Sequence, residues 1–366
     1  MSSRRGRSRR ALRRLLGVTL LPRMRPDKVL RARAALRRWG LTPAGAYAVA
    51  AIRTPKRTAI IDEHGALTFS EVHERTDALA HALQRMGLRE SDTVAIMCAN
   101  HRGFIEATVA CTKLAADILY LDPHAGAGEL AETLRRESPR LMIHDETFTA
   151  RVRALPETRE RLIARCEPGR AAGHPSLEKL IAENAAATPA PPANGQQSTI
   201  TLTANGAGER TRRRLGATLM TESAACSRIP LRPREPTMIA APLCGAWGFL
   251  HLTLALRLGS TLLLRREFQP IETLAAVDRH GVTALALLPD MLAQIMALPR
   301  QTIAWYATEH LEVIAVRGPT LPGELAIPAR EHFGDVLYNL GGRSVINLET
   351  GWPWPTPTLS RPAHAA

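Results

Sequence analysis

Residues 93–121, TVAIMCANHRGFIEATVACTKLAADILYL, contain two short apolar runs on either side of a longer amphipathic run. The runs at 93–98 and 118–121 have the length and apolar content of buried strands. Residues 102–114 repeat apolar side chains at the spacing of a helix. A strand, a helix and a second strand in this order predict a βαβ unit with parallel strands.

The same alternation continues on both sides of this segment. Upstream, we expect strands at 58–62 and 67–69 and a helix at 70–86. Downstream, we expect strands at 141–144, 200–203, 238–241, 260–264, 283–288, 312–316 and 336–338. The expected helices between them cover 128–137, 246–258, 271–280, 290–297 and 323–333. This order predicts an α/β fold with mainly parallel strands in two consecutive βα-repeat halves.

Composition divides the chain into five expected segments. A stretch rich in alanine, proline and glutamine separates the two halves, as expected for a linker loop. The segments are a basic, partly disordered or amphipathic tail (1–40), a first half (41–183), the linker (184–199), a second half (200–350) and a proline-rich tail (351–366).

The positive charge is concentrated near the N-terminus. The formal net charge is +14, and residues 1–38 contain thirteen arginines and Lys28 against one acid, Asp27. The remainder is nearly neutral, which argues against nucleic acid as a partner. Residues 4–38 are a candidate contact for an anionic membrane surface, with 29–39 as a short amphipathic helix. The alternative is a solvated helix that packs its leucines on the body.

Cysteine usage indicates the compartment. Five cysteines are scattered along the chain without a C-x-x-C pair, which argues against a disulfide framework or a zinc site. We therefore expect a cytoplasmic protein, with peripheral membrane contact as an extension of that reading. The sequence contains no apolar run long enough for a membrane-spanning helix.

Residues 200–213, ITLTANGAGERTRR, are interpreted as a strand that leads into a glycine loop. Backbone N–H groups in such loops bind phosphate. The chain has no lysine after Lys179, so nearby arginines are the only candidate cations. The candidate nucleotide-binding residues of this segment are Thr203, Gly206, Gly208, Arg210 and Arg212.

Further candidates follow other expected strands, because ligands of α/β folds bind at the carboxyl ends of strands. Gly318, Gly342 and Ser344 are the nucleotide-site candidates of this kind. Cys244 and Trp247 are candidates for an acyl pocket, with Cys244 as a buried structural cysteine rather than a nucleophile. His101 follows a strand and is expected in a solvated loop.

The ordered landmarks between about residues 41 and 350 resemble the large N-terminal domain of the adenylate-forming (AMP-binding) superfamily, specifically the acyl-CoA synthetases or fatty-acid–CoA ligases. The landmarks include AIIDEHGALTFSEV, PLCGAWGFLHLTLALRLGSTLLL, VTALALLPDMLAQI and HFGDVLYNLGGRS. The resemblance implies a layered αβαβα domain. It also implies a reaction in which ATP and a fatty acid or other carboxylate give an acyl-adenylate, which CoA then converts to a thioester, with Mg²⁺ as cofactor.

The sequence departs from that family where the chemistry occurs. The family's phosphate loop resembles T-S-G-T-T-G-x-P-K. Its two adjacent threonines are Gly206 and Ala207 here, and its lysine position is Thr211. Glu209 adds a negative charge. Elsewhere, Gly341 stands where the family has the aromatic residue that covers adenine. Val345 stands at the position of the acid that holds magnesium, and Gly245 at the position of a motif histidine.

The sequence also ends before the position of the family's small C-terminal domain, so we expect that domain to be absent. No catalytic residue and no metal ligand is assigned. We therefore expect a truncated, degenerate pseudoenzyme with weak activity or none, retaining ATP, AMP or acid binding. The alternatives are an active acid–CoA ligase that uses Arg210 or Arg212 together with a second domain supplied by a partner, a non-catalytic membrane-surface or protein-interaction module, and a non-functional gene fragment.

Overall fold

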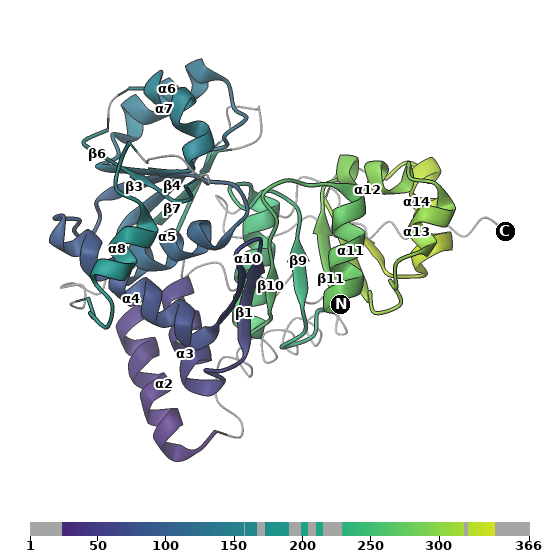
Figure 1. The fold of residues 1–366 in the computed structure, drawn as a ribbon, viewed down its shortest axis with the longest axis horizontal. Helices are drawn as coiled ribbons and strands as arrows, with labels where there is room; N and C mark the ends of the chain where they lie inside the picture. Colours follow the sequence, from purple (N-terminus) through teal and green to yellow (C-terminus); the bar gives the residue numbers. More distant parts are fainter. Residues whose placement is uncertain are drawn as a thin grey trace, which may run out of the picture.

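The computed structural model describes the chain over residues 24–156, 158–166, 173–189, 199–203, 210–214, 229–317 and 321–340. Its strands form two mainly parallel sheets with helices around and between them (Figure 1). The predicted α/β fold is therefore confirmed.

The first sheet consists of β3 (Thr93–Met97), β4 (Asp117–Tyr120), β5 (Leu141–His144), β6 (Glu160–Ile163), β7 (Thr199–Thr203) and β8 (Arg210–Arg214). Its order is β6-β5-β3-β4-β7-β8. β3 is the parallel neighbour of both β4 and β5, so the chain changes sides of β3 between them. Such a reversal creates a crevice at the carboxyl ends of the strands.

The second sheet consists of β1 (Thr58–Asp62), β2 (Gly65–Thr68), β9 (Thr237–Ile239), β10 (Leu262–Leu263), β11 (Ala284–Leu287), β12 (Val313–Val316) and β13 (Leu337–Asn339). Its order is β13-β12-β11-β9-β10-β1-β2. β1 pairs in parallel with β10, about 200 residues later in the chain. The expected first half thus contributes two strands to the sheet of the second half, while the domain boundaries themselves remain predictions.

The helices are α2 (Pro26–Trp39), α3 (Pro43–Arg53), α4 (Phe69–Arg85), α5 (Arg102–Lys113), α6 (Ala127–Glu137), η1 (Glu146–Phe148), α7 (Thr149–Arg153), α8 (Leu177–Glu183), α10 (Ala246–Leu258), α11 (Pro270–His280), α12 (Pro289–Met296), α13 (Arg300–Ala304) and α14 (Gly323–Phe333). α4 begins where the sequence predicts, because Thr68 and Glu71 form a capping box. The elements without a counterpart among the expected ones are α3, η1, α7, β6, α8, β8 and α13.

Buried clusters show that these elements form five layers. The largest cluster joins both sheets through α4, α5 and α10, and Phe104 stacks on Tyr120 with ring centroids 4.9 Å apart. A second cluster covers the outer face of the first sheet with α6 and α7. A third covers the outer face of the second sheet with α11, α12 and α14. The predicted αβαβα layering is confirmed.

Candidate functional site

Asn100 joins the carboxyl ends of the two sheets. It lies three residues beyond Met97, where β3 ends, and is 5% exposed. Its Nδ2 donates to the carbonyl oxygens of Ile239 at 3.1 Å and Ala241 at 3.0 Å, and its Oδ1 accepts from the N–H of Leu243 at 2.9 Å. Because Ile239 ends β9, the carboxyl edges of the two sheets meet at this residue.

The predicted ligand loops begin at these same edges. Thr203 ends β7, Val316 ends β12 and Asn339 ends β13. Each strand runs parallel to its neighbour, so these ends lie on the edge that carries the end of β3 or β9. The predicted residues Gly206, Gly208, Gly318, Gly342 and Ser344 lie outside the described residues.

Arg210 and Arg212 belong to a strand rather than to a loop, which corrects the expected extent of the glycine loop. β8 pairs antiparallel with β7 in a register that places Arg210 opposite Thr203 and Arg212 opposite Thr201. The backbone ladder between the strands thus starts at residue 210. The same register places Thr211 opposite Leu202.

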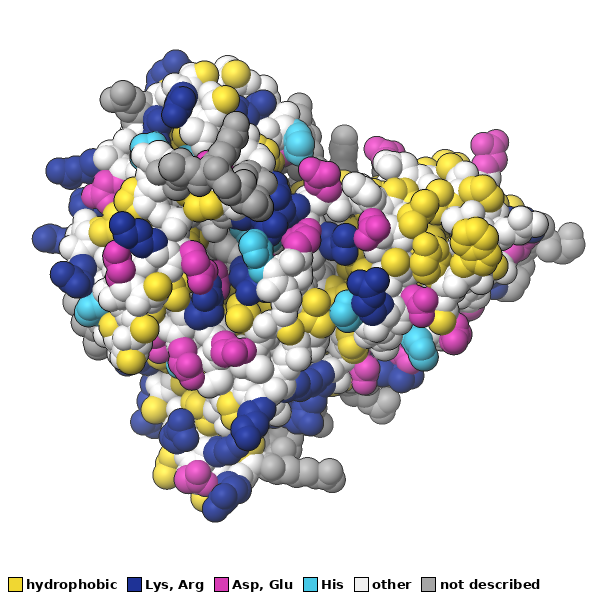
Figure 2. Space-filling view, in the orientation of Figure 1, with side chains coloured by type: hydrophobic (Ala, Val, Ile, Leu, Met, Phe, Trp, Pro, Cys, Tyr) yellow, Lys and Arg dark blue, Asp and Glu magenta, His cyan; other side chains and the backbone are white. Residues whose placement is uncertain are grey.

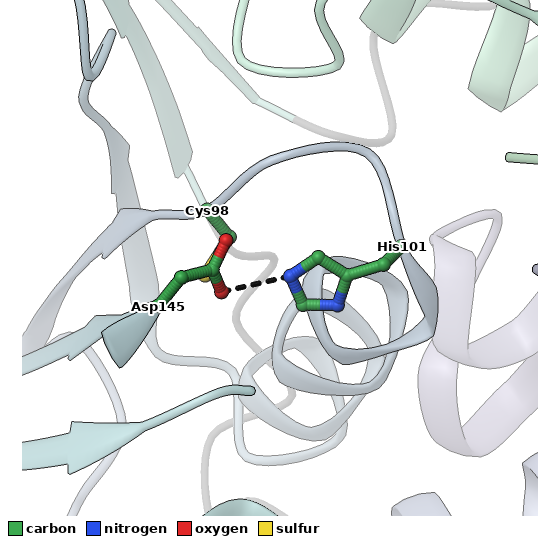
Figure 3. A group of neighbouring side chains, drawn as sticks. All are labelled: Cys98, His101 and Asp145. Atoms are coloured by element: carbon green, nitrogen blue, oxygen red, sulfur yellow. Dashed lines mark hydrogen bonds and ion pairs between the residues drawn. The ribbon is translucent and has the colours of Figure 1, made fainter. Parts of the chain in front are cut away.

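Three buried side chains of types that can act in catalysis or bind a metal lie together beside Asn100: Cys98, His101 and Asp145 (Figure 3). Cys98 follows β3 and Asp145 follows β5, and these strands are neighbours, so the two residues leave the same edge together. His101 caps the N-terminus of α5 and reaches Asp145 Oδ1 with its Nε2 at 2.7 Å. One potential metal-binding atom from each residue, the cysteine sulfur, an imidazole nitrogen and a carboxylate oxygen, lies within 4.8 Å of the other two.

The hydrogen bonds of His101 indicate its tautomer. His101 Nδ1 accepts from the N–H of Gly103 at 3.0 Å, so the imidazole proton is on Nε2 and is donated to Asp145. Asp145 Oδ2 accepts from the N–H of Ala99 at 2.9 Å. Burial, followed by the charge of Asp145, raises the pKa of the Cys98 thiol well above its ordinary value. With no imidazole lone pair facing the thiol and no thiolate, the group is a satisfied polar network rather than a nucleophile–base pair.

The expectation of a solvated His101 is wrong, because the residue is only 1% exposed. Its ring fills the space beside Gly103, where an added Cβ would lie 2.7 Å from the ring. Sequence reasoning also missed Asn100 and Asp145. The available signal was a polar residue shortly after each of two buried strands, Asn100 three residues beyond β3 and Asp145 directly after β5.

The two acyl-pocket candidates lie in the hydrophobic core. Cys244 precedes α10, and burial raises the pKa of its thiol to about 12, so the expected structural cysteine is buried as predicted. Trp247 is buried in α10, where its Nε1 donates to the carbonyl oxygen of Leu287 at 3.0 Å. Their contact with an acyl group stays a prediction.

Comparisons with known proteins identify relatives. The family described as AMP-binding enzyme matches residues 47–204 and 210–346. A feruloyl-CoA synthase from Amycolatopsis sp. is 28% identical over 75% of this chain and 53% of its own length. A medium-chain fatty-acid–CoA ligase from Escherichia coli is 26% identical over 81% of this chain and 55% of its own length.

The fold is also found among solved structures. The anthranilate CoA ligase AuaEII, solved with anthranoyl-AMP, superposes with a TM-score of 0.73 at 16% identity and covers 82% of this chain and 58% of its own. The chain spans about half the length of the curated relatives it matches. Among the described helices, none combines the length and the hydropathy needed to cross a membrane.

Proposed function

Because the chain belongs to the AMP-binding enzyme family, we propose that it retains the binding architecture of an acid–CoA ligase but activates carboxylic acids very slowly or not at all. The observation that carries this proposal is the break in the family match over residues 205–209. These positions connect the paired strand ends Thr203 and Arg210 at the carboxyl edge of the first sheet.

The residues in the break, together with Thr211 just after it, explain why adenylation would be slow. The family's loop supplies hydroxyl and lysine donors to the triphosphate, whereas this chain has Gly206, Ala207 and Thr211 at those positions. Glu209 adds repulsion toward phosphate. Loss of one transition-state donor costs about 3 kcal/mol, or about 100-fold in rate. Two such losses would slow adenylation by about four powers of ten.

The magnesium ion of the family reaction has no matching ligand at the expected position. Val345 stands where the family's metal-holding acid would be, and its apolar side chain offers no oxygen ligand. The residue present does not fit the ion. Bound ATP or AMP without turnover is the state that the remaining backbone donors favour.

The ligand class follows from the relatives. We propose an aromatic or medium-chain aliphatic carboxylate, with CoA as the co-substrate of any residual ligase activity. We also propose a cytoplasmic location, since the described cysteines, Cys98, Cys111, Cys166 and Cys244, form no disulfide. An active ligase with Arg210 or Arg212 as the substitute cation is the second candidate, because the strand that follows the loop is arginine-rich.

ATP–pyrophosphate exchange with ferulate and medium-chain fatty acids tests the proposal. We expect exchange at least about a thousandfold below that of an active ligase assayed in parallel, together with a thermal shift by AMP. Ordinary exchange that is lost in Arg210→Ala or Arg212→Ala would replace this proposal with the active-ligase reading. If the chain shows no exchange and no thermal shift by AMP, the proposal of nucleotide binding is also wrong.

A further inference from the structure

The helix α2 has one face on the body and one in solvent. Ala32 and Ala35 are buried and pack in a cluster with Ala48 and Val49 of α3. Leu30 lies on the opposite side and is 67% exposed. The sequence alternative in which the helix packs its leucines on the body is therefore wrong for Leu30, but Leu36 does pack against this cluster beside the two alanines.

The exposed side of α2 is basic. Leu30, Arg33, Ala34 and Arg37 are spaced as one helical stripe, and all four are exposed, as is the neighbouring Arg31. Among the described residues, no ion pair involves the side chains of these three arginines. Asp27 is the only acid of the helix, and it lies 3.8 Å from Arg25.

The basic surface continues beyond α2. Lys28 Nζ donates to the carbonyl oxygen of Arg53 at the end of α3, at 3.4 Å. Arg53 and Arg234 line one pocket, and Arg57 Nη1 donates to the carbonyl oxygen of Gly259 in that lining at 3.3 Å, so the three arginines lie close together. Burial and then repulsion by Arg234 lower the pKa values of Arg53 and Arg57. Glu235 is the acid that opposes them. Figure 2 shows Lys and Arg side chains over the part of the molecule where Figure 1 draws α2.

We propose that this surface binds an anionic lipid bilayer. We call it the α2 basic face, and define it as the exposed side of α2 together with Arg53, Arg57 and Arg234. An arginine near an anionic membrane surface favours binding about fivefold. Several arginines presented by one rigid helix act on the same membrane plane, so their contributions multiply.

Leu30 distinguishes a bilayer from a nucleic acid as the partner. An exposed leucine among arginines can enter the apolar boundary of a membrane, whereas a phosphate backbone gives it no contact. The chain directly before α2 repeats this chemistry, since residues 1–23 contain eight arginines around the apolar run LLGVTLL at 15–21. The surface and the preceding sequence therefore favour the same partner.

Flotation of the full chain with vesicles tests the proposal. We expect binding to phosphatidylcholine vesicles that contain phosphatidylglycerol, no binding to phosphatidylcholine alone, and a loss of binding as salt is added. The triple variant Arg31→Gln, Arg33→Gln, Arg37→Gln should lower the partition coefficient by about 100-fold. Leu30→Gln alone should also lower the partition coefficient, without changing its salt dependence.

The matched control is Arg85→Gln, Arg135→Gln, Arg279→Gln, which removes the same charge from exposed positions on other helices. It should bind vesicles as the unaltered chain does. Equal weakening by both triple variants would overturn the proposal, as would absence of binding to anionic vesicles. Binding of a DNA duplex in preference to the vesicles, lost in the α2 variant and unaffected by Leu30→Gln, would also overturn it in favour of nucleic acid. Unfolding curves of each variant exclude misfolding as the cause.

Discussion

Asn100 Oδ1 lies 2.9 Å from the backbone nitrogen of Leu243, although 143 residues separate them. The same side chain donates its Nδ2 to Ala241. A primary amide can accept and donate at once, which neither a carboxylate nor a hydrocarbon of similar size can do. One buried side chain thus holds together the two strand edges at which ligands of this fold class bind.

Replacing Asn100 with alanine should therefore destabilise the fold. The change leaves the Leu243 N–H and the Ala241 carbonyl without their partner in a buried site. Such losses cost about 1–3 kcal/mol for each unsatisfied group. We expect the free energy of unfolding in urea to fall by about 2–4 kcal/mol.

The control for this variant is Asn184→Ala, because Asn184 Nδ2 makes its bond to Leu180 at 2.8 Å within a single helix end. That change should cost less than about 1 kcal/mol. Asn100→Asp keeps an acceptor for Leu243 but places a charge against Ala241, so it should be at least as destabilising as alanine. An Asn100→Ala protein as stable as the Asn184→Ala protein would contradict the conclusion that Asn100 holds the two strand edges together.

Two glycines offer a matched test of close packing. A Cβ at Gly248 would lie 2.2 Å from the Pro242 carbonyl oxygen, whereas a Cβ at Gly128 would meet nothing within 4 Å. Both lie in helices, where alanine is favoured over glycine by about 1 kcal/mol. We expect Gly128→Ala to raise the melting temperature and Gly248→Ala to lower it. The same sign of shift for both would show that the contact at Gly248 relaxes freely.

The fold was predictable because its signals are local. The alternation of strands and helices and the nearly neutral charge of the body follow from spacing and composition. The pairing of β1 with β10 was not predictable in this way, since nothing near residue 60 specifies a partner near residue 262. Short elements such as α7 and β6 carry too few residues for a periodic signal.

Burial gives His251 a pH dependence with a definite sign. Its Nδ1 is 3.1 Å from the Trp247 carbonyl oxygen, and burial lowers the pKa of His251 from 6.5 to about 4. Between these values the unfolded chain holds a proton that the folded chain does not. The free energy of unfolding should therefore fall as the pH drops from 6.5 toward 4.

His251→Leu removes this titration. We expect the unaltered chain to lose about 2 kcal/mol more than the variant between about pH 7 and pH 5, measured by urea unfolding. His73 shifts in the same direction, so the variant keeps part of the loss. His124→Gln, at an exposed position, serves as the control and should leave the difference unchanged. An identical pH response of the His251→Leu protein would exclude His251 as its source.

The site was predictable only in part, and the reason is physical. A strand before a glycine loop is visible in the sequence, so Thr203 at the end of β7 was found. The start of β8 at Arg210 depends on a ladder with β7 and was missed. The network of His101 and Asp145 depends on β3 lying beside β5, a relation between segments about 45 residues apart.

Thr211 gives the sharpest test of the proposed loss of adenylation. It occupies the family's lysine position and lies opposite Leu202 in the β7–β8 pairing. Thr211→Lys restores a point charge there, and a charge-assisted bond to phosphate contributes about 1.5–3 kcal/mol. ATP should then bind about tenfold or more tightly, as measured by the thermal shift across an ATP titration. Thr302→Lys adds the same charge to α13, which packs beside β11 and β12 at the end of the molecule away from the first sheet (Figure 1), and should leave the ATP titration unchanged. Tighter binding in both variants would reduce the effect to net charge, whereas no gain in Thr211→Lys would mean that the missing lysine is not what limits this site.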